Sequence, residues 1–242
     1  MSRRVASVTF IYNHEPFIIP HFTMLSNLDH NFAFVGDKPL QGYDSEHGTS
    51  AVKDRSEELI REKFPHVEIV HHSYDGVFCS ELYNAVSHIF ENYDIVLRLD
   101  PDMFFTDSDW SRLINFIREG NQDSYYVNYP KCSINYYMDF DHGLQDAMEC
   151  DLIGYDPKKK LTGILDYPSE KPYVINWNNF MIHHFRGWNK PKSVTPNWPN
   201  EDYGRMAFFN YSNDGDWFHC PQEIRDKFDK ETADKWLQIF NT

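Results

Sequence analysis

The chain has 242 residues, and its 23 Lys and Arg against 37 Asp and Glu give a formal net charge of −14 at pH 7. A chain of this length can bury roughly 70–75% of its unfolded surface in one core, so it needs no disulfide or metal ion to fold. Aromatic residues make up 17% and charged residues 25%, a composition that argues against intrinsic disorder. The excess negative charge disfavours generic binding to nucleic acid or anionic lipid.

The cysteines and the apolar runs indicate where the protein resides. No CxxC pair occurs among Cys79, Cys132, Cys150 and Cys220, which predicts free thiols in a reducing compartment. The N-terminus turns polar too soon after a short apolar run for a signal peptide. No stretch approaches the roughly 18 apolar residues that span a bilayer. We therefore predict a soluble cytoplasmic protein that does not bind membranes.

Strand-like and helix-like segments alternate through the first half of the chain. Apolar, β-branched runs predict strands at Val5–Tyr12, Phe32–Val35, Val67–His71, Ile95–Leu99 and Tyr125–Asn128. Helical spacing of apolar residues predicts helices that begin at Pro16, near Ser50, after an N-cap at Ser80 and after a cap at Thr106 or Asp107. The helix after Ser80 should run to Phe90, and the one after Thr106 should end at Gly120. Strands joined by helical crossovers predict an α/β fold with a Rossmann-type, mostly parallel central sheet.

The second half of the chain is less regular. Residues 129–172 have weak periodicity, which predicts an irregular region that builds a binding site. A strand is predicted within Val174–Phe185, and Pro221 should open a last amphipathic helix that carries Ile224 and Phe228. We predict one domain over residues 1–242, with a nucleotide-binding half of about 1–130 and a substrate-binding half of about 131–242.

The sharpest local signal is the Asp100-Pro101-Asp102 sequence, which directly follows the predicted strand Ile95–Leu99. Ligands of open α/β sheets bind beyond the carboxyl ends of strands, so both acids would lie at the rim of a crevice. Pro101 stiffens the turn between them. Two carboxylates on a rigid turn suit manganese or magnesium, which would bridge the oxygens of a diphosphate. The alternative is a pair of surface aspartates that cap the next helix.

The segment Leu97–Phe105 resembles the DxD segment of GT-A glycosyltransferases. The order of predicted elements before it is similar to the nucleotide-sugar-binding half of that fold. The resemblance implies a GT-A-like fold, a nucleotide-sugar donor that we expect to be UDP-linked, and a divalent cation, manganese in preference to magnesium. Asp102 would be a direct metal ligand, and Asp100 would contact the ribose or, through water, the metal.

The same resemblance implies which residues meet the rest of the donor. Tyr12 and Asn13 follow the first predicted strand, where members of this fold read the nucleobase. Asp75 and Gly76 follow the third strand of the predicted series and would lie nearby.

A second segment, His183–Pro191, resembles the His-Phe-x-Gly-x-x-Lys-Pro segment of glycogenin-type retaining glycosyltransferases. This resemblance implies that His184 is the third protein ligand of the metal. Gly187 would let the backbone approach the phosphates, and Lys190 would neutralise the leaving diphosphate. The alternative is a strand-end turn with a packing histidine, which is how we interpret His183.

A third segment, Trp198–Arg205, resembles the Glu-Asp helix start of inverting GT-A enzymes. The resemblance implies that Asp202 is the general base that deprotonates the acceptor hydroxyl. In those enzymes a metal-binding histidine lies further downstream, where His219 is found here. The chain fits neither pattern fully, so retention and inversion both stay open. Glu201 and Asp202 could instead be plain first-turn acids of a helix.

The acceptor and the rival functions depend on weaker signals. The basic residues gather at Lys158–Lys160 and at Arg186, Lys190 and Lys192, either as a solvated loop or as a site for an anionic acceptor. That acceptor could be a glycan, a protein or, for a virus-encoded enzyme, a hydroxymethylated DNA base. A nucleotidyltransferase would need a basic Gly-rich loop after the first strand, unlike the sequence Asn13-His14-Glu15-Pro16. A non-catalytic nucleotide-sugar-binding domain is the second rival.

Overall fold

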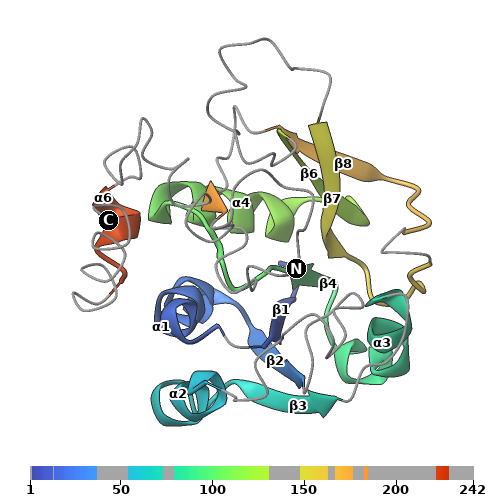
Figure 1. The fold of residues 1–242 in the computed structure, drawn as a ribbon. Helices are drawn as coiled ribbons and strands as arrows, with labels where there is room; N and C mark the ends of the chain where they lie inside the picture. The colour runs from blue at the N-terminus through green and yellow to red at the C-terminus, as the bar shows by residue number, and fades with distance from the viewer. Residues whose placement is uncertain are drawn as a thin grey trace, which may run out of the picture.

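The computed structural model describes residues 2–12, 14–36, 54–72, 79–130, 148–162, 167–176, 183–184 and 222–228. These residues form a seven-stranded sheet with helices on both faces (Figure 1). The strand order is β3-β2-β1-β4-β7-β6-β8. Neighbours are parallel from β3 to β4, β7 is antiparallel to both of its neighbours, and β8 is parallel to β6. The predicted α/β class with a mostly parallel sheet is confirmed.

The bounds of the elements are as follows. The large sheet contains β1 (Val5–Ile11), β2 (His30–Gly36), β3 (Glu68–His72), β4 (Ile95–Arg98), β6 (Ser124–Pro130), β7 (Met148–Tyr155) and β8 (Pro172–Asn176). A small sheet pairs β5 (Met103–Phe104) with β9 (His183–His184). The helices are α1 (Glu15–Met24), α2 (Ser56–Lys63), α3 (Cys79–Ala85), α4 (Asp107–Glu119) and α6 (Gln222–Arg225), with short 3₁₀ helices η1 (Leu25–Asn27) and η3 (Ser87–Phe90).

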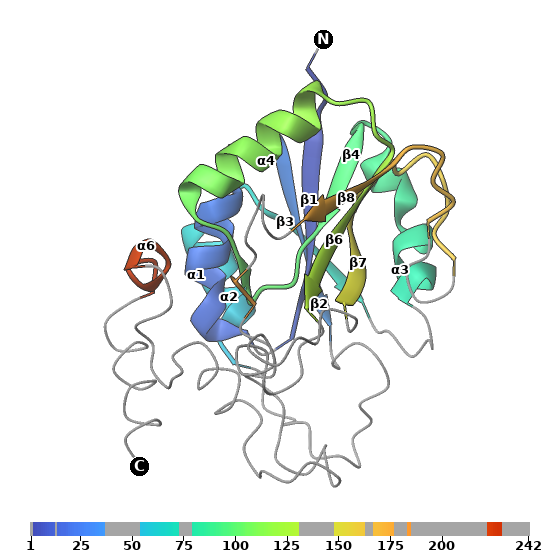
Figure 2. The ribbon, with the colours of Figure 1, turned by 90° about the horizontal axis from the view of Figure 1, so that it is seen from above.

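The central strand β1 is buried along its whole length, because helices cover both faces of the sheet. Its side chains alternate between two apolar cores, as the pleat of a strand requires. Val5 and Ile11 belong to the core under α1, α2 and α4, whereas Val8 and Phe10 belong to the core under α3. Figure 2 shows α3 on the opposite side of the sheet from the other three helices. This double coverage explains the continuous apolar run from which the strand was predicted.

Helix α4 has the boundaries that the sequence predicts. The hydroxyl of Thr106 accepts a hydrogen bond from the backbone N–H of Asp109 at 3.2 Å, which makes Thr106 the N-cap. Gly120 is the C-cap. The apolar stripe between the two caps is buried against the sheet, and it consists of Trp110, Leu113, Ile114 and Ile117.

Two helix predictions are corrected. Ser80 is not an N-cap but a buried residue inside α3, and this helix ends at Ala85 instead of continuing to Phe90. The hydroxyl of Ser87 donates to the carbonyl oxygen of Asn84 at 3.0 Å, so a side chain competes with the helical ladder and the chain continues as 3₁₀. Helix α2 begins at Ser56, not near Ser50, and residues 50–53 lie outside the described residues.

The predicted irregular region contains a strand at the middle of the sheet. Strand β7 lies between β4 and β6, although its sequence shows little alternation. A register shift between Tyr125 and Tyr126 of β6 breaks the period of the pairing. Gly154 lies close to β4, and a Cβ there would lie 2.9 Å from Cδ2 of Leu97, so a larger residue would force the Leu97 side chain to move. The prediction of irregularity for residues 148–155 was therefore wrong, since neighbouring strands decide the pattern.

The rest of the second half agrees with the sequence where it is described. Strands β8 and β9 overlap the predicted strand, and α6 lies at the start of the predicted last helix. Ile224 and Phe228 are buried. Strands from both sides of residue 130 share one sheet, and the division into a donor half and an acceptor half stays a prediction. Among the described residues, no helix has the length and apolarity to cross a membrane.

Candidate functional site

Strands β1 to β4 end at a common edge of the sheet, which we call the carboxyl edge. The chain passes from β1 to β2 on one side of β1 and returns from β3 to β4 on the other side. The strand order therefore reverses between β1 and β4, and crevices for ligands form at such points in α/β sheets. Val8 pairs with Arg98 at the end of β4, and β1 continues to Ile11. The residues that follow β1 and β4 meet at this position.

The Asp100-Pro101-Asp102 turn leaves β4 at this position. The N–H of Met103 donates to the carbonyl oxygen of Asp100 at 3.0 Å and closes the turn. The side chain of Asp100 is 33% exposed and lies 3.4 Å from Nη2 of Arg98, whereas Asp102 is only 9% exposed. Neither acid caps the next helix, because Thr106 fills that role. Both acids lie at the carboxyl edge, as predicted. Their role in binding stays a prediction.

The backbone of His184 lies beside this turn. Strands β5 and β9 pair antiparallel, with Met103 opposite His184. The register thus places His184 next to Met103, the residue that follows Asp102, although about 80 positions separate the two in the chain. In the described part of the chain, no three His, Cys, Asp or Glu side chains form a group that could hold a metal ion. A complete metal site would therefore need a ligand such as the His184 side chain, which lies outside the described part.

His14 lies at the carboxyl edge, before α1, and it was not identified as a site residue from the sequence. Its Nδ1 accepts a hydrogen bond from the backbone N–H of Tyr12 at 3.1 Å. Burial lowers the pKa of His14 below 6.5, against the opposing effect of the negative charges of Asp102, Asp100 and Asp54. The imidazole is therefore neutral at pH 7 among three acids. A histidine two residues after the predicted strand, at the edge where ligands bind, was the signal that could have identified it.

Asp54 locks the starts of α1 and α2 together at the same edge. Its carboxylate accepts the backbone N–H of Glu15 at 2.8 Å and that of Ser56 at 2.9 Å. In return, Oε2 of Glu15 accepts the N–H of Arg55 at 3.1 Å. The Ser56 hydroxyl accepts the N–H of His14 at 2.9 Å. These bonds satisfy donors that a helix start leaves unpaired, and they fix the segment that carries His14.

The remaining predicted site residues divide into one that is described and several that are not. Tyr12 follows β1 directly and is half-buried at the carboxyl edge. The other predicted positions lie outside the described residues, so their roles stay predictions. These positions are Asn13, Asp75, Gly76, Gly187, Lys190, Glu201, Asp202 and His219.

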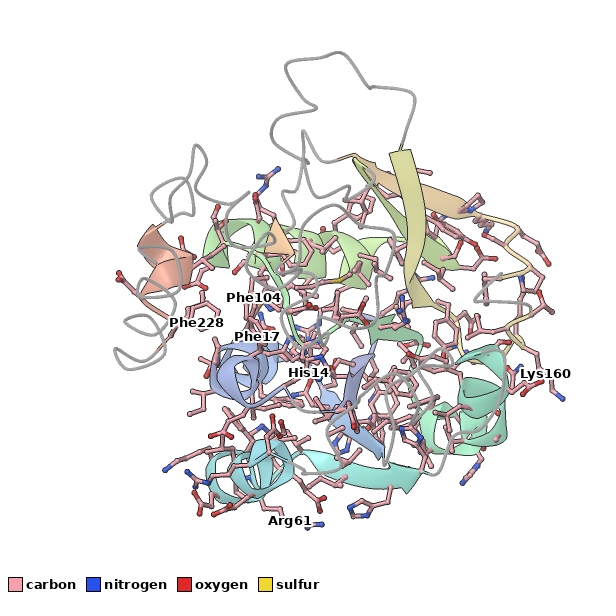
Figure 3. The ribbon with its side chains drawn as sticks, in the orientation of Figure 1. His14, Phe17, Arg61, Phe104, Lys160 and Phe228 are labelled. Atoms are coloured by element: carbon pink, nitrogen blue, oxygen red, sulfur yellow. The ribbon has the colours of Figure 1, made fainter. Side chains whose placement is uncertain are left out.

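The lysine run lies at the opposite, amino edge of the sheet. Nζ of Lys159 lies 3.1 Å from Oδ2 of Asp123 and 3.2 Å from Oε1 of Glu170. Nζ of Lys158 lies 3.9 Å from Oδ1 of Asp94. In Figure 3, Lys160 lies at the side of the molecule beside α3, whereas His14 lies near its centre. These pairings agree with the solvated-loop alternative, and Arg186 and Lys192 lie outside the described residues.

Comparison with known proteins yields structural likenesses only. No protein-family model matches the sequence, and no curated protein matches it. Three solved structures illustrate the likenesses, each covering most of both chains. The 4-diphosphocytidyl-2C-methyl-D-erythritol synthase of Anaerococcus prevotii is 12% identical, with a TM-score of 0.40, over 73% of this chain and 89% of that one. Residues 1–349 of S. aureus TarS are 10% identical, with a TM-score of 0.41, over 98% and 78%. Rv0371C of Mycobacterium tuberculosis, in complex with manganese, is 7% identical, with a TM-score of 0.43, over 73% and 90%. Likenesses of this size say nothing about the reaction of this chain.

Proposed function

We propose that the chain is a metal-dependent glycosyltransferase of the GT-A type, which moves a sugar from a nucleoside-diphosphate sugar to an acceptor hydroxyl. The observation that carries the proposal is the position of Asp100 and Asp102. They follow β4 where the strand order reverses beside β1, on a turn that caps no helix. Two carboxylates on a stiff turn at a ligand crevice are suited to a divalent cation and the diphosphate that it binds.

The chemistry of these residues fits a cation. Asp102 is nearly buried and Asp100 is one-third exposed; Asp102 would bind the cation directly, away from water, and Asp100 would contact the ribose or, through water, the metal. With the imidazole of His184 as third ligand, the donor set contains oxygen and nitrogen, which favours manganese over magnesium. The cation would neutralise charge on the leaving diphosphate. Lys190 would add a second positive charge, and Gly187 would let the backbone come close.

The remaining roles follow from the resemblance. Tyr12, Asn13 and Asp75 would contact the nucleoside of the donor, which we propose to be UDP-linked. Asp202 would be the general base if the reaction inverts, and a retaining reaction would need no protein base. Among the acceptors, a glycan or a protein is favoured over a modified DNA base. Lys158 and Lys159 lie beside carboxylates at the amino edge, which is opposite the edge that carries Asp100 and Asp102.

The connection between β1 and α1 argues against the nucleotidyltransferase alternative. A nucleotidyltransferase would require a basic Gly-rich loop after the first strand. Here three residues, Tyr12 to His14, separate the end of β1 from the start of α1. The backbone N–H of Glu15 at this helix start donates to the carboxylate of Asp54, and the Glu15 carboxylate itself lies in the first turn. A phosphate group would therefore meet negative charge instead of free N–H groups.

A screen of nucleotide sugars for manganese-dependent hydrolysis tests the proposal, because such enzymes leak donor to water. We expect one donor to be hydrolysed, chelation to abolish the reaction, and Asp102→Asn to abolish it too. Asp109→Asn, a half-buried first-turn position of α4 whose carboxylate pairs with Arg112, is the matched control and should retain activity. Activity that survives both chelation and Asp102→Asn contradicts the proposal. Diphosphate release from a nucleoside triphosphate and a sugar phosphate would indicate a nucleotidyltransferase, and donor binding without turnover a binding module.

A further inference from the structure

A buried polar pair lies inside the apolar core beneath the carboxyl edge. Thr9 on β1 and His21 on α1 are both 0% exposed, and Oγ1 of Thr9 lies 2.9 Å from Nε2 of His21. Thr9 is on the same face of β1 as Val5 and Ile11, toward α1. A polar group in such a place destabilises the fold by about 1–3 kcal/mol unless it is hydrogen-bonded. The hydrogen bond between Thr9 and His21 offsets this cost and holds the ring in one orientation.

His21 contacts the segment that follows Asp102. Its ring meets the ring of Phe104 edge-on, with 6.3 Å between centroids. Nδ1 of His21 makes no hydrogen bond of ordinary geometry, although the backbone of Met103 lies close enough to favour its protonation. Burial lowers the pKa of His21 to about 3, against the opposing charge of Asp102. A neutral ring thus links Thr9 to Phe104, two residues after the acid.

Helix α1 supports the rest of that segment with apolar contacts. Sδ of Met24 accepts the N–H of Phe105 at 3.4 Å. The ring of Phe17 lies 6.1 Å from that of Phe104, and Phe228 packs on Phe104 at 5.4 Å (Figure 3). Residues 103–105 are therefore held by side chains along α1 and by Phe228. His21 is the polar member of this set, and the ring that it contacts, Phe104, lies two residues after Asp102.

We infer that His21, held in place by Thr9, is a positioning residue that packs against Phe104, fixes the segment that follows Asp102, and thereby aims the Asp102 carboxylate at the bound cation. The inference rests on the proposed function and extends it to two buried side chains that touch neither cation nor donor. The groups that orient a metal ligand typically change metal affinity by about 10–100-fold when they are removed. A residue that merely fills the core would change stability without changing that affinity.

Manganese binding to the full chain tests the inference, measured by the electron paramagnetic resonance signal of free Mn²⁺. Thr9→Val keeps the shape of the side chain but removes the hydroxyl, whereas Thr9→Ser keeps the hydroxyl. We expect Thr9→Val and His21→Phe to weaken manganese binding about 10-fold, and Thr9→Ser to bind like the wild type. Ser7→Ala is the matched control. It breaks another buried pair of β1, between Ser7 Oγ and Asn31 Oδ1 at 2.6 Å, and should leave manganese affinity unchanged.

The outcomes distinguish a failure of the positioning role of His21 from a failure of the proposed function. Wild-type affinity in folded Thr9→Val and His21→Phe overturns the positioning role and leaves the proposed function standing. If His21→Phe does not fold, the comparison of Thr9→Val with Thr9→Ser still decides. If Ser7→Ala weakens binding as much as Thr9→Val, the effect is general loss of core order and the inference is overturned. A wild-type chain that binds no manganese overturns the proposed function and this inference together.

Discussion

The two edges of the sheet each carry a cluster of acids, and the clusters are built in opposite ways. At the amino edge, the carboxylate of Asp123 accepts hydrogen bonds from the hydroxyl of Ser169 at 2.5 Å and from the N–H groups of Glu170 at 2.8 Å and Lys171 at 3.0 Å. Nζ of Lys159 adds a cation at 3.1 Å. Burial would raise the pKa of Asp123, but these donors hold it well below its usual value.

At the carboxyl edge, the negative charges of three acids act on a histidine. Asp54, Asp100 and Asp102 all act on His14, whose pKa is lowered by burial. Among the described residues, Nη2 of Arg98 lies 3.4 Å from Asp100. Asp123 is thus bound within the fold by a lysine, a hydroxyl and two N–H groups, whereas Asp100 is one-third exposed at the carboxyl edge. The difference separates an aspartate that stabilises the fold from the pair that we propose to bind a cation.

The largest effect expected from this difference is on activity. Asp102→Asn should lower manganese-dependent donor hydrolysis at least about 100-fold, with a melting temperature close to that of the wild type in the absence of metal. Asp123→Asn should lose stability but keep its activity per folded molecule. Steady-state hydrolysis and thermal melts of both variants measure this. Equal losses of activity in the two folded variants would contradict the contrast between the edges.

The next effect is on stability and its dependence on pH. Asp123→Asn should lower the free energy of unfolding by about 2 kcal/mol at pH 7, because charge-assisted hydrogen bonds to a shielded carboxylate are lost. The folded pKa lies below the ordinary value of 3.8, so this stabilisation is fully present above that value. It is lost as pH falls through the folded pKa.

Urea unfolding of the wild type and Asp123→Asn at several pH values measures that dependence. The difference between the two proteins should be constant from pH 7 to about pH 5 and shrink in stronger acid. Lys159→Met removes one donor to Asp123. Its difference from the wild type in free energy of unfolding should be smaller and should depend on pH in the same direction. A difference that does not change with pH would mean that the hydrogen bonds, not the charge of Asp123, carry the stabilisation.

The sequence predicted the parallel half of the fold because local pattern and final environment agree there. The strand β1 is covered on both faces and reads as one apolar run, and α4 has its cap, its stripe and its terminal glycine in order. Strand β7 was missed because its pattern depends on neighbours, through the register shift in β6 and the contact of Gly154 with Leu97. Non-local constraints of this kind leave little local signal.

The candidate site divides in the same way. Asp100 and Asp102 follow a strand with a strong local pattern, so their position at the carboxyl edge could be predicted. His14 and Asp54 could not be linked from sequence, since 39 positions separate Glu15 from the Asp54 carboxylate that binds its N–H. The Thr9–His21 pair was missed because both residues lie within apolar segments, where a polar residue is easily taken for part of the core.

A smaller effect, on stability, is expected at the start of α4, the helix that runs from the carboxyl edge to the amino edge. Thr106→Ala removes the hydroxyl that accepts the N–H of Asp109 and should lower the free energy of unfolding by about 1 kcal/mol. Because α4 starts after β5 and not at the turn itself, manganese affinity should stay at the wild-type value. Thr106→Ser retains the cap and is the control. A loss of manganese binding in Thr106→Ala would mean that the acids depend on the helix start for their position.

The smallest effect is expected at Lys160, and it tests whether the amino edge is silent in the reaction. Lys160 is exposed and lies beside α3, away from His14 (Figure 3). Lys160→Ala should therefore change neither the melting temperature nor the KM for acceptor or donor. Lys159→Ala is the contrasting variant, since it removes the cation that pairs with Asp123 and should lower the melting temperature without changing either KM. A rise in acceptor KM in Lys160→Ala, reversed by Lys160→Arg, would bring the amino edge into acceptor binding. The two edges would then no longer divide between stability and function, because one lysine run would serve both.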